Sequence, residues 1–490
     1  MPAPLAAPPP PVTASRTAVF RCRVRDLLIA APPLMAVDAT VAEVARRMTA
    51  ERSSAVLVLD KGGGLAGIVT EQDVVRRGHD RSRPAGEIMS APVLTVGAEE
   101  PLYRAIGFMR RHRLKHMPVL DPRGALAGML ELHEALAVAA GDVAGDIDRL
   151  TREDSLQGLA EVKAAQIGLA GRLLAGAVPV PEIQALLADL NNDVHRRVLD
   201  LLLAELGPPP VPFACIVMGS GGRGESLLFP DQDNGFVLAD YPDARHPEID
   251  RWFVALAERF AAALDGLGFP LCRGGVMAMN PVWRKTLPQW RAQLAQWMRG
   301  RVPETLLNCE IFFDFRRVWG ERELTDSLRS HAIGAAQADR GFQMLMYGLQ
   351  ALNRAGIGLF GRLRVESSGA AHRGEIDLKQ HGALPLVEAV RLLALARGIA
   401  ATGTLDRIAA LREADALRVD DADWLRATFT LLTRLLLRRQ LADHRAGRPL
   451  TSFVDPERLT ARERDLLRDG LRAINDFRAG LRAELTGSLL

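Results

Sequence analysis

Residues 24 to about 138 contain an internal repeat with an offset of 60 to 61 residues. The matched segments are Ala31-Pro32 with Ala91-Pro92, Ala55–Asp60 with Met117–Asp121, and Gly67–Val69 with Gly128–Leu130. Each copy reads as a lead-in segment, an amphipathic helix, a short apolar strand, a turn, a second strand and a closing helix. The amphipathic helices are predicted at Val41–Ala50 and Leu102–His112. The repeat therefore predicts two related α/β units in this part of the chain.

Two such units resemble a tandem pair of cystathionine-β-synthase (CBS) domains, at about 24–80 and 85–138. The resemblance implies pseudo-symmetric packing, frequent association into homodimers, and binding of an adenine nucleotide (AMP or ATP). In that family a Thr/Ser-x-x-Asp after the second strand holds the ribose and phosphate, and Thr70 and Asp73 match it. The same two residues also fit an N-terminal cap of the following helix, and both roles can hold at once. The second unit has Glu131 and Glu134 at these positions. A carboxylate repels phosphate, so we expect at most one nucleotide site per pair.

A second informative stretch lies between residues 213 and 240. The apolar run Phe213–Met218 predicts a buried strand, and Gly219–Gly224 then leaves little side chain between the backbone and a bound group. Asp231 and Asp233 precede another apolar run, Phe236–Ala239. Side chains two apart on a strand point the same way, and two adjacent carboxylates favour a hard divalent cation such as Mg²⁺. Glycine backbone beside Mg²⁺ is typical of a nucleoside triphosphate site.

These residues resemble the signature of the polymerase-β-like nucleotidyltransferases, especially the branch with the uridylyltransferase of the PII nitrogen regulators. The residues that carry the resemblance are Gly219, Ser220, Arg223, Glu225, Asp231, Gln232 and Asp233. It implies a nucleotide-binding loop made of Gly219, Ser220, Gly221 and Arg223. It also implies a catalytic, Mg²⁺-binding pair made of Asp231 and Asp233.

The third carboxylate of that branch is missing here. Segment Gly268–Pro281 is predicted to carry the next strand and a glycine-rich turn, but it offers only Cys272, Arg273 and Gly274 at the corresponding positions. Asp314, in a strand predicted at Glu310–Phe315, is a candidate substitute catalytic residue. An ion pair with Arg316 is the equally weighted alternative for Asp314.

Helical periodicity dominates the remaining chain. Helices are predicted at Leu150–Leu174, Ile183–Leu206, Glu248–Leu267, Gln343–Leu359, Leu384–Ala401, Thr404–Leu411, Asp423–Ala442 and Ala461–Leu485. The polar run Asn191–Arg197 is interpreted as a solvated face, with substrate contact as the alternative. The charged patch Glu366–Gly382 either lines a cleft facing the glycine-rich region or is an exposed loop. Trp283, Trp290 and Trp297 repeat every seven residues, which favours a core or interface stripe over a base-stacking platform.

From Val24 to the C-terminus the chain resembles a bacterial family of signal-transduction proteins. The resemblance implies a multidomain α/β plus α architecture: a CBS pair, a nucleotidyltransferase-like domain and a helical substrate-binding domain. The predicted boundaries are 1–23 for a disordered tail, 24–138 for the CBS pair, 141–207 for a helical linker, 208–330 for the nucleotidyltransferase-like domain and 335–490 for the helical domain.

Composition narrows the class of function. The net charge is +3, from 62 basic and 59 acidic residues, which argues against a dedicated nucleic-acid binder. The four scattered cysteines form no C-x-x-C pair, and no apolar run reaches the length of a membrane span, so we expect a cytoplasmic protein with reduced thiols.

Two hypotheses follow. In the first, the chain is an enzyme that transfers a nucleoside monophosphate from a nucleoside triphosphate to a protein or small-molecule acceptor, under control of adenine nucleotide at the CBS pair. In the second, it is a catalytically inactive, nucleotide-sensing scaffold. The missing acid near Cys272 favours the second, whereas the intact G-S and D-x-D favour the first. A third possibility, nucleotidyl transfer to RNA, is disfavoured by the near-neutral charge.

Overall fold

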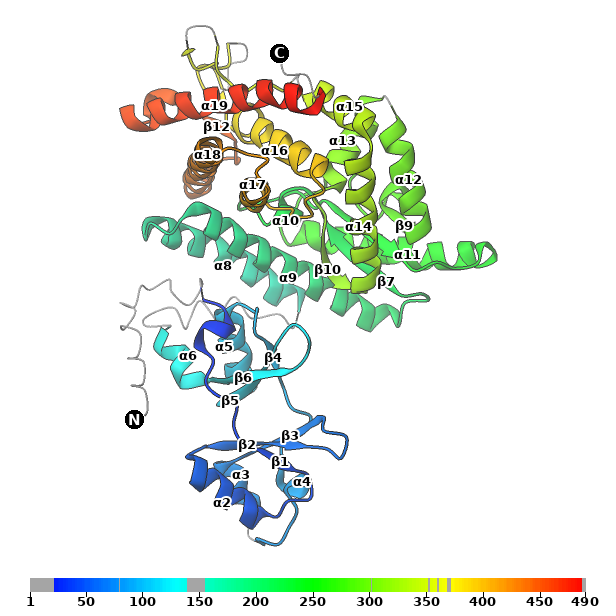
Figure 1. Ribbon diagram of the computed structural model, residues 1–490, viewed down its shortest axis with the longest axis vertical. Coiled ribbons are helices and arrows are strands. Elements are labelled where there is room, and N and C mark those ends of the chain that lie inside the picture. Colours follow the sequence, from blue (N-terminus) through cyan, green and yellow to red (C-terminus); the bar gives the residue numbers. More distant parts are fainter. Residues whose placement is uncertain are drawn as a thin grey trace. The chain divides into compact units, whose positions relative to one another are not determined.

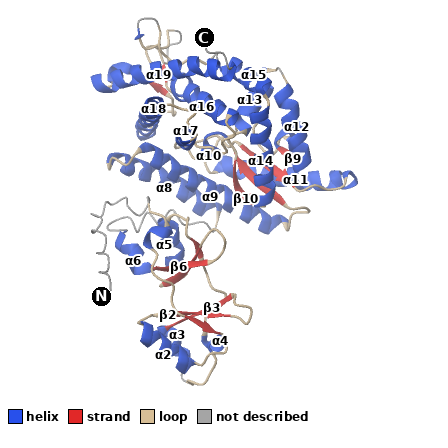
Figure 2. Ribbon diagram, in the orientation of Figure 1, coloured by secondary structure: helices blue, strands red, loops and turns tan. Residues whose placement is uncertain are grey.

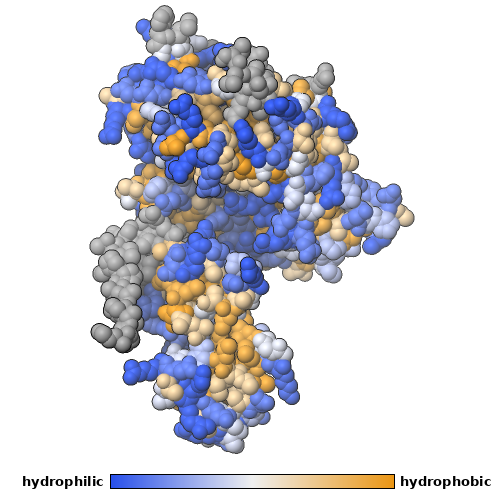
Figure 3. All heavy atoms as spheres, viewed as in Figure 1, coloured by the Kyte–Doolittle hydropathy of each residue, from blue (hydrophilic) through white to orange (hydrophobic). Residues whose placement is uncertain are grey.

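The computed structural model describes residues 22–78, 80–138, 155–300, 302–350, 353–358, 361–367 and 372–486. It divides into two compact units, Met1–Thr151 and Arg152–Leu490 (Figure 1). The tail expected at 1–23 lies outside the described residues except for Cys22 and Arg23, as do residues 141–154 of the expected linker. Figure 3 shows an apolar area on the visible face of the first unit, whereas polar side chains form most of the visible surface of the second.

The first unit contains two copies of one arrangement. In the first copy the elements are the 3₁₀ turn η1 (Val24–Leu27), β1 (Leu34–Ala36), α2 (Val41–Glu51), β2 (Ala55–Leu59), β3 (Leu65–Thr70) and α3 (Glu71–Arg77). In the second they are the short helix α4 (Ala85–Ile88), β4 (Val96–Gly97), α5 (Leu102–Arg111), β5 (His116–Leu120), β6 (Leu126–Glu131) and α6 (Leu132–Val138). Both sheets pair their first two strands parallel and their last two antiparallel, in the orders β1-β2-β3 and β4-β5-β6. The predicted repeat is confirmed.

Side chains of the two copies meet. Ser54 directly precedes β2 and His116 begins β5, and the Ser54 Oγ and His116 Nε2 atoms lie 3.4 Å apart. Backbone hydrogen bonds between Ile29 and Met129 also tie the lead-in segment to the second sheet. These contacts hold the two copies together.

The second unit contains a four-stranded sheet of order β10-β7-β8-β9. Its strands are β7 (Phe213–Val217), β8 (Asn234–Leu238), β9 (Arg284–Thr286) and β10 (Arg316–Gly320). The central strands β7 and β8 run antiparallel and are buried along their whole length, as their apolar composition requires. The pairing of Val217 with Asn234 places the end of β7 beside the beginning of β8. The segments that follow β7 and precede β8 therefore lie side by side.

Helices surround this sheet and form the rest of the unit (Figure 2). Those before and around the sheet are α8 (Leu156–Ala175), α9 (Val180–Leu206), α10 (Gly219–Arg223), α11 (His246–Gly266), α12 (Leu287–Arg299), α13 (Pro303–Phe312) and α14 (Arg322–Ala338). Those after it are α15 (Arg340–Gln350), α16 (Leu384–Ala396), α17 (Thr404–Glu413), α18 (Val419–Arg445) and α19 (Ala461–Thr486). Short elements are the 3₁₀ turns η2 (Asp243–Arg245), η3 (Pro281–Trp283) and η6 (Pro456–Arg458), the π-helical turn η5 (Lys379–Ala383), and the strand pair β11 (Ile376–Asp377) and β12 (Phe453–Val454). We call residues 208–330 the head and residues 335–490 the bundle.

One apolar core runs from the sheet into the bundle. It joins Ile216 and Val237 of the central strands to Leu392 of α16 and Leu432 of α18. The tryptophan stripe lies within it, with ring centroids 5.4 to 6.3 Å apart and all three side chains buried. The prediction that this stripe is core is confirmed. Among the described residues, no helix combines the length and the apolar character that crossing a bilayer requires.

Three local predictions are wrong. Segment Gly268–Pro281 contains no strand, and the strand after α11 lies at Arg284–Thr286. Residues Glu310–Phe312, predicted as strand, end helix α13, and the strand follows at Arg316–Gly320. The run Asn191–Arg197 is not a solvated face, because Asn191, Asn192, Asp193 and His195 are all buried. In each case the local sequence pattern was compatible with both the predicted and the observed structure, and packing against distant segments favoured the observed one.

Candidate functional site

The glycine-rich segment Gly219–Gly224, which we call the glycine loop, forms the short helix α10 and its C-cap and lies directly against the D-x-D segment. The N–H of Met218 donates to the carbonyl of Asp233 at 2.9 Å, which continues the β7–β8 pairing by one step. Gly219 has φ +58°, and a Cβ atom at this residue would lie 2.7 Å from Oδ2 of Asp233. Only glycine fits there without moving the carboxylate. The structure thus brings the predicted phosphate-binding residues and one predicted metal-binding carboxylate together.

Asp231 and Asp233 were expected to lie on a strand, but both precede β8, which begins at Asn234. Asp231 is exposed, Gln232 is fully buried and Asp233 is half-buried, so Asp231 and Asp233 share the open side of the segment. Gln232 fixes this alternation, because its side-chain amide donates to the carbonyls of Ala261 at 3.1 Å and Phe269 at 3.0 Å. The middle residue of D-x-D is therefore the anchor that turns both acids outward.

The surroundings of Asp233 disfavour the ionised form of its carboxyl group. Burial raises its pKa, a hydrogen bond from the Cys272 thiol lowers it, and the charge of Asp231 raises it. The net shift is upward, because burial and the like charge of Asp231 outweigh the Cys272 hydrogen bond and the positive charges of Lys379 and Arg223. Two carboxylate oxygen donors on one open side fit a hard cation that takes its remaining ligands from water and phosphate oxygens. The residues present therefore fit a Mg²⁺ ion.

Cys272 occupies the neighbourhood where the third carboxylate was sought. Burial and the charge of Asp233 raise the pKa of this thiol to about 11, so it is a neutral hydrogen-bond donor at physiological pH. Among the described residues, no group of three or more His, Cys, Asp or Glu side chains has an arrangement able to hold a metal ion. A cation at this site would depend on two protein carboxylates and on the ligand.

Arg223 and Asp314 form a buried charge cluster under the glycine loop. The guanidinium of Arg223 bonds Glu225 at 2.6 Å and Asp314 at 2.7 Å. Asp314 is fully buried and also pairs with Arg391 at 3.0 Å and Arg407 at 2.7 Å. Burial would raise the pKa of Asp314, but the three arginines lower it to about 2.

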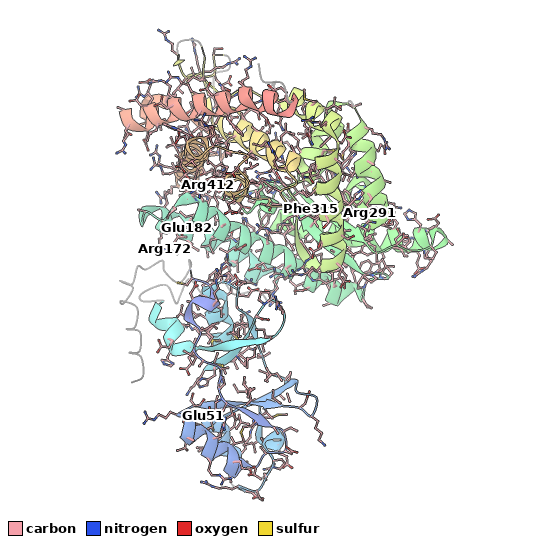
Figure 4. The ribbon with its side chains drawn as sticks, viewed as in Figure 1. Glu51, Arg172, Glu182, Arg291, Phe315 and Arg412 are labelled. Atoms are coloured by element: carbon pink, nitrogen blue, oxygen red, sulfur yellow. The ribbon has the colours of Figure 1, made fainter. Side chains whose placement is uncertain are left out.

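This cluster corrects both predictions for Asp314. Its partners are three arginines and not Arg316, which lies 3.7 Å from Asp189 instead. A carboxylate surrounded by three positive charges is also a poor ligand for a cation, so the assignment of Asp314 as a substitute catalytic residue is withdrawn. Phe315, labelled in Figure 4, follows it and lies under the Arg329 guanidinium, 4.1 Å from ring centroid to Cζ. The Arg223 guanidinium binds two carboxylates, those of Glu225 and Asp314. This geometry shows Arg223 as a partner of acids and not as the predicted phosphate ligand.

The bundle reaches the glycine loop from the other side. The N–H of Thr404, at the start of α17, donates to Oε1 of Glu225 at 2.5 Å. Arg391 of α16 and Arg407 of α17 supply two of the three partners of Asp314. Within the patch Glu366–Gly382, the exposed Lys379 acts electrostatically on Asp233 and lowers its pKa. The head and bundle therefore share one charged site.

In the first unit, Thr70 caps α3. Its side chain accepts from the N–H of Asp73 at 3.4 Å, and Oδ2 of Asp73 accepts from the Thr70 N–H at 3.0 Å and hydroxyl at 2.7 Å. The capping interpretation is confirmed, and the nucleotide-binding one stays a prediction. The equivalent Glu131 lies 3.5 Å from the ring of His116 and 3.2 Å from that of His133. The second copy thus has a carboxylate and two imidazoles in place of a hydroxyl.

Sequence reasoning missed the side chains that hold the segment between the glycine loop and β8. We call this segment, Glu225–Asp233, the acidic loop. Gln184 of α9 donates to the carbonyl of Glu225 at 2.9 Å, and Lys163 of α8 donates to that of Leu228 at 3.0 Å. Gln440 of α18 accepts from the Leu228 N–H at 3.2 Å. A signal was present in the sequence: Lys163 and Gln184 are polar residues at helix positions that the apolar periodicity assigns to the core.

Comparison with known protein families matches three parts of the chain. Residues 24–80 and 85–141 match the CBS domain. Residues 165–304 match the family described as "Putative nucleotidyltransferase DUF294", and residues 341–485 match "Putative nucleotidyltransferase substrate binding domain". The predicted architecture is confirmed.

Individual relatives cover only part of this chain. The inosine-5'-monophosphate dehydrogenase of Mycobacterium tuberculosis is 29% identical over 168 residues, which are 34% of this chain and 30% of that enzyme. The homoserine O-acetyltransferase of Methanohalophilus mahii is 32% identical over 91 residues, 19% of each chain. The match therefore spans less than a third of the length of either relative.

Solved structures show similarly partial likeness. A CBS domain protein from Pyrobaculum aerophilum complexed with AMP is 25% identical and covers 24% of this chain and 98% of its own, with a TM-score of 0.23. An uncharacterized conserved protein from Pyrococcus horikoshii is 21% identical and covers 25% of this chain and 95% of its own, also with a TM-score of 0.23.

Proposed function

Because this chain combines a tandem CBS pair with a DUF294 nucleotidyltransferase domain and its substrate-binding domain, we propose that it is a nucleotidyltransferase regulated by nucleotide binding. The reaction is transfer of a nucleoside monophosphate from a nucleoside triphosphate to a hydroxyl of a protein or small-molecule acceptor. The observation that carries the proposal is the contact between Gly219 and the Asp233 carboxylate, which puts a side-chain-free backbone and an acidic pair on one open side.

The chemistry assigns a distinct task to each part of the site. The backbone of Gly219, Ser220 and Gly221 lets triphosphate oxygens approach closely and offers N–H donors to them. Asp231 and Asp233 would hold Mg²⁺, which when bound neutralises phosphate charge and aligns the triphosphate. The acceptor hydroxyl oxygen forms a bond to the α-phosphorus, the bond to the bridging oxygen breaks, pyrophosphate leaves, and the hydroxyl proton passes to water. Lys379, whose charge acts on Asp233, would stabilise the charge of the leaving pyrophosphate.

For the CBS pair we propose one adenine nucleotide, held by the first copy. Thr70 and Asp73 are half-buried at the start of α3, where a hydroxyl can donate to phosphate and a carboxylate can accept from ribose hydroxyls. In the second copy, Glu131 at the position of Thr70 repels phosphate. The asymmetry predicts a single bound nucleotide per chain.

A specific observation favours a second candidate, the catalytically inactive scaffold. Cys272 contacts Asp233 as a neutral thiol, so the site has two carboxylates where a third was expected. In that case the head binds a nucleotide without transferring it.

The test is label transfer with the purified full chain. We would mix it with Mg²⁺, each of the four α-labelled nucleoside triphosphates in turn and lysate from the native host, with and without AMP. The comparison is with an Asp231→Asn/Asp233→Asn double variant and with Asp240→Asn, an exposed acid beyond the other end of β8. Label that appears with wild type and Asp240→Asn but not with the double variant establishes transfer. Triphosphate binding without any variant-sensitive label establishes the scaffold.

A further inference from the structure

Lys163 is a buried lysine that has no acidic partner within the described part of the chain. It lies on α8 and is 4% exposed, and no described carboxylate forms an ion pair with it. Its ammonium donates to Oδ1 of Asn191 at 2.9 Å, to the carbonyl of Leu228 at 3.0 Å and to Oε1 of Gln166 at 3.3 Å. The three donors of the ammonium thus meet three neutral oxygens from three different segments.

Aromatic rings complete the enclosure. The Nζ atom lies 4.2 Å from the centroid of Phe269 and 5.6 Å from that of Phe229. A cation over aromatic faces is stabilised by the ring quadrupole, more so when water is excluded. Burial lowers the pKa of Lys163 to about 7, because the charged form loses its water. A methionine of similar volume would avoid that desolvation but would make none of the three hydrogen bonds.

One of those hydrogen bonds reaches the acidic loop. Leu228 lies near the middle of the loop, and both of its backbone polar groups are held: the carbonyl by Lys163 and the N–H by Gln440. Only Phe229 and Pro230 separate Leu228 from Asp231, and Pro230 has a fixed φ angle. The position of Leu228 therefore constrains where the backbone enters Asp231.

We propose that Lys163 is a positioning residue for the acidic loop: its hydrogen bond to Leu228 sets the place of Asp231 and Asp233 and so the affinity of the site for a divalent cation. This inference rests on the proposed function in so far as the two aspartates bind a metal. Lys163 touches neither the metal nor the nucleotide, and it acts only through the backbone that carries the ligands.

The test compares the full-length wild type with Lys163→Met, which keeps the volume of the side chain and removes its donors. Two readouts are needed: the affinity for Mn²⁺ measured by titration, and amide hydrogen exchange across Glu225–Asp233. Leu169→Ala is the matched control, because Leu169 is buried on the same helix and its truncation leaves the Lys163 hydrogen bonds in place. Asn191→Leu is a second variant, which keeps the lysine but removes its nearest oxygen partner.

We expect Lys163→Met to weaken Mn²⁺ binding by about tenfold, the size of effect seen when groups that orient metal ligands are removed, and to accelerate exchange in the acidic loop. Asn191→Leu should give a smaller change in the same direction. Leu169→Ala should lower the melting temperature but leave Mn²⁺ affinity within about twofold. Loop exchange and Mn²⁺ affinity that are unchanged in Lys163→Met, or changed equally in Leu169→Ala, would overturn the proposal.

The two proposals fail in different ways. If wild type shows no Mn²⁺ binding that Asp233→Asn removes, the metal-dependent function is wrong. Hydrogen exchange then still decides whether Lys163 orders the acidic loop, because that measurement requires no metal.

Discussion

Replacing Asp314 with Asn tests whether the charge cluster under the glycine loop is structural. Asn keeps the shape of the side chain and removes its charge. Three guanidinium groups, those of Arg223, Arg391 and Arg407, then lose the carboxylate that lies within 3.0 Å of each of them. Of these three, Arg223 alone has a second acidic partner among the described residues, Glu225.

The expected loss follows from the burial of the cluster. The pKa of Asp314 falls from 3.8 to about 2, even though burial alone would raise it. A shift of this size corresponds to about 2 kcal/mol of stabilisation of the ionised form. Removing one partner of a buried ion pair costs about 3–5 kcal/mol, because the remaining charges stay desolvated. We expect the free energy of unfolding of the second unit to fall by about 3 kcal/mol or more.

The assay is urea denaturation followed by tryptophan fluorescence. Trp283, Trp290 and Trp297 are buried in the core of the second unit and report its unfolding. The midpoint should fall for Asp314→Asn with an unchanged slope. Asp189→Asn is the control, because Asp189 forms a more exposed 3.7 Å pair with Arg316 and should contribute less than about 1 kcal/mol.

Two outcomes would refute this reasoning. If Asp314→Asn has the same midpoint as Asp189→Asn, the cluster does not stabilise the fold. If Asp314→Asn is stable but loses divalent-cation binding, Asp314 belongs to the metal site after all. The pH dependence gives a further check: the folded pKa is below the unfolded one, so the contribution is full above about pH 4 and is lost as pH falls toward 2.

Three further predictions concern single residues. Asp233→Asn should abolish Mn²⁺ binding in a titration but leave the urea midpoint of the metal-free chain unchanged or slightly raised, since burial and Asp231 already disfavour the carboxylate. Thr70→Ala should destabilise the first unit by about 1 kcal/mol through loss of the cap and weaken AMP binding in calorimetry; a stability loss with unaltered AMP affinity would leave only the capping role. The pKa of Glu388 is raised to about 7 by burial and by Glu310, so stability should fall as pH rises from about 4.5 through 7, and Glu388→Gln should remove this slope between urea titrations at pH 5.5 and pH 8.

The parts of the fold that the sequence predicted are those with a local signature. The repeat is visible in the sequence because equivalent residues recur at a nearly constant spacing. That spacing alone predicts two copies of one α/β arrangement. The contact between the glycine loop and Asp233 was also foreseeable, because β7 and β8 are short apolar runs separated by the two motifs. Both predictions depend on residues that are neighbours in the chain or in a regular pattern.

The failures concern residues whose environment comes from distant segments. Asn191 looked solvated because its partner, Lys163, lies 28 residues away on another helix. Asp314 looked like a metal ligand or a partner of Arg316 because Arg391 and Arg407 lie far along the chain, in the bundle. Glu310–Phe312 looked like a strand because a largely buried helix end has no periodic polar face. Propensity and periodicity carry no information about such partners.

The sharing of Asp314 between head and bundle limits how this protein can be cut or recombined. The head supplies the carboxylate, but two of its three counter-charges, Arg391 and Arg407, come from the bundle, and Lys163 of α8, N-terminal to the head, holds the acidic loop. A fragment limited to residues 208–330 would leave Asp314 with Arg223 as its one arginine partner of the three and the acidic loop without the Lys163 hydrogen bond. The smallest fragment suited to engineering or crystallisation is therefore the whole stretch from about residue 156 to 486. Grafting the glycine and D-x-D motifs alone would transfer the predicted ligands without the side chains that position them.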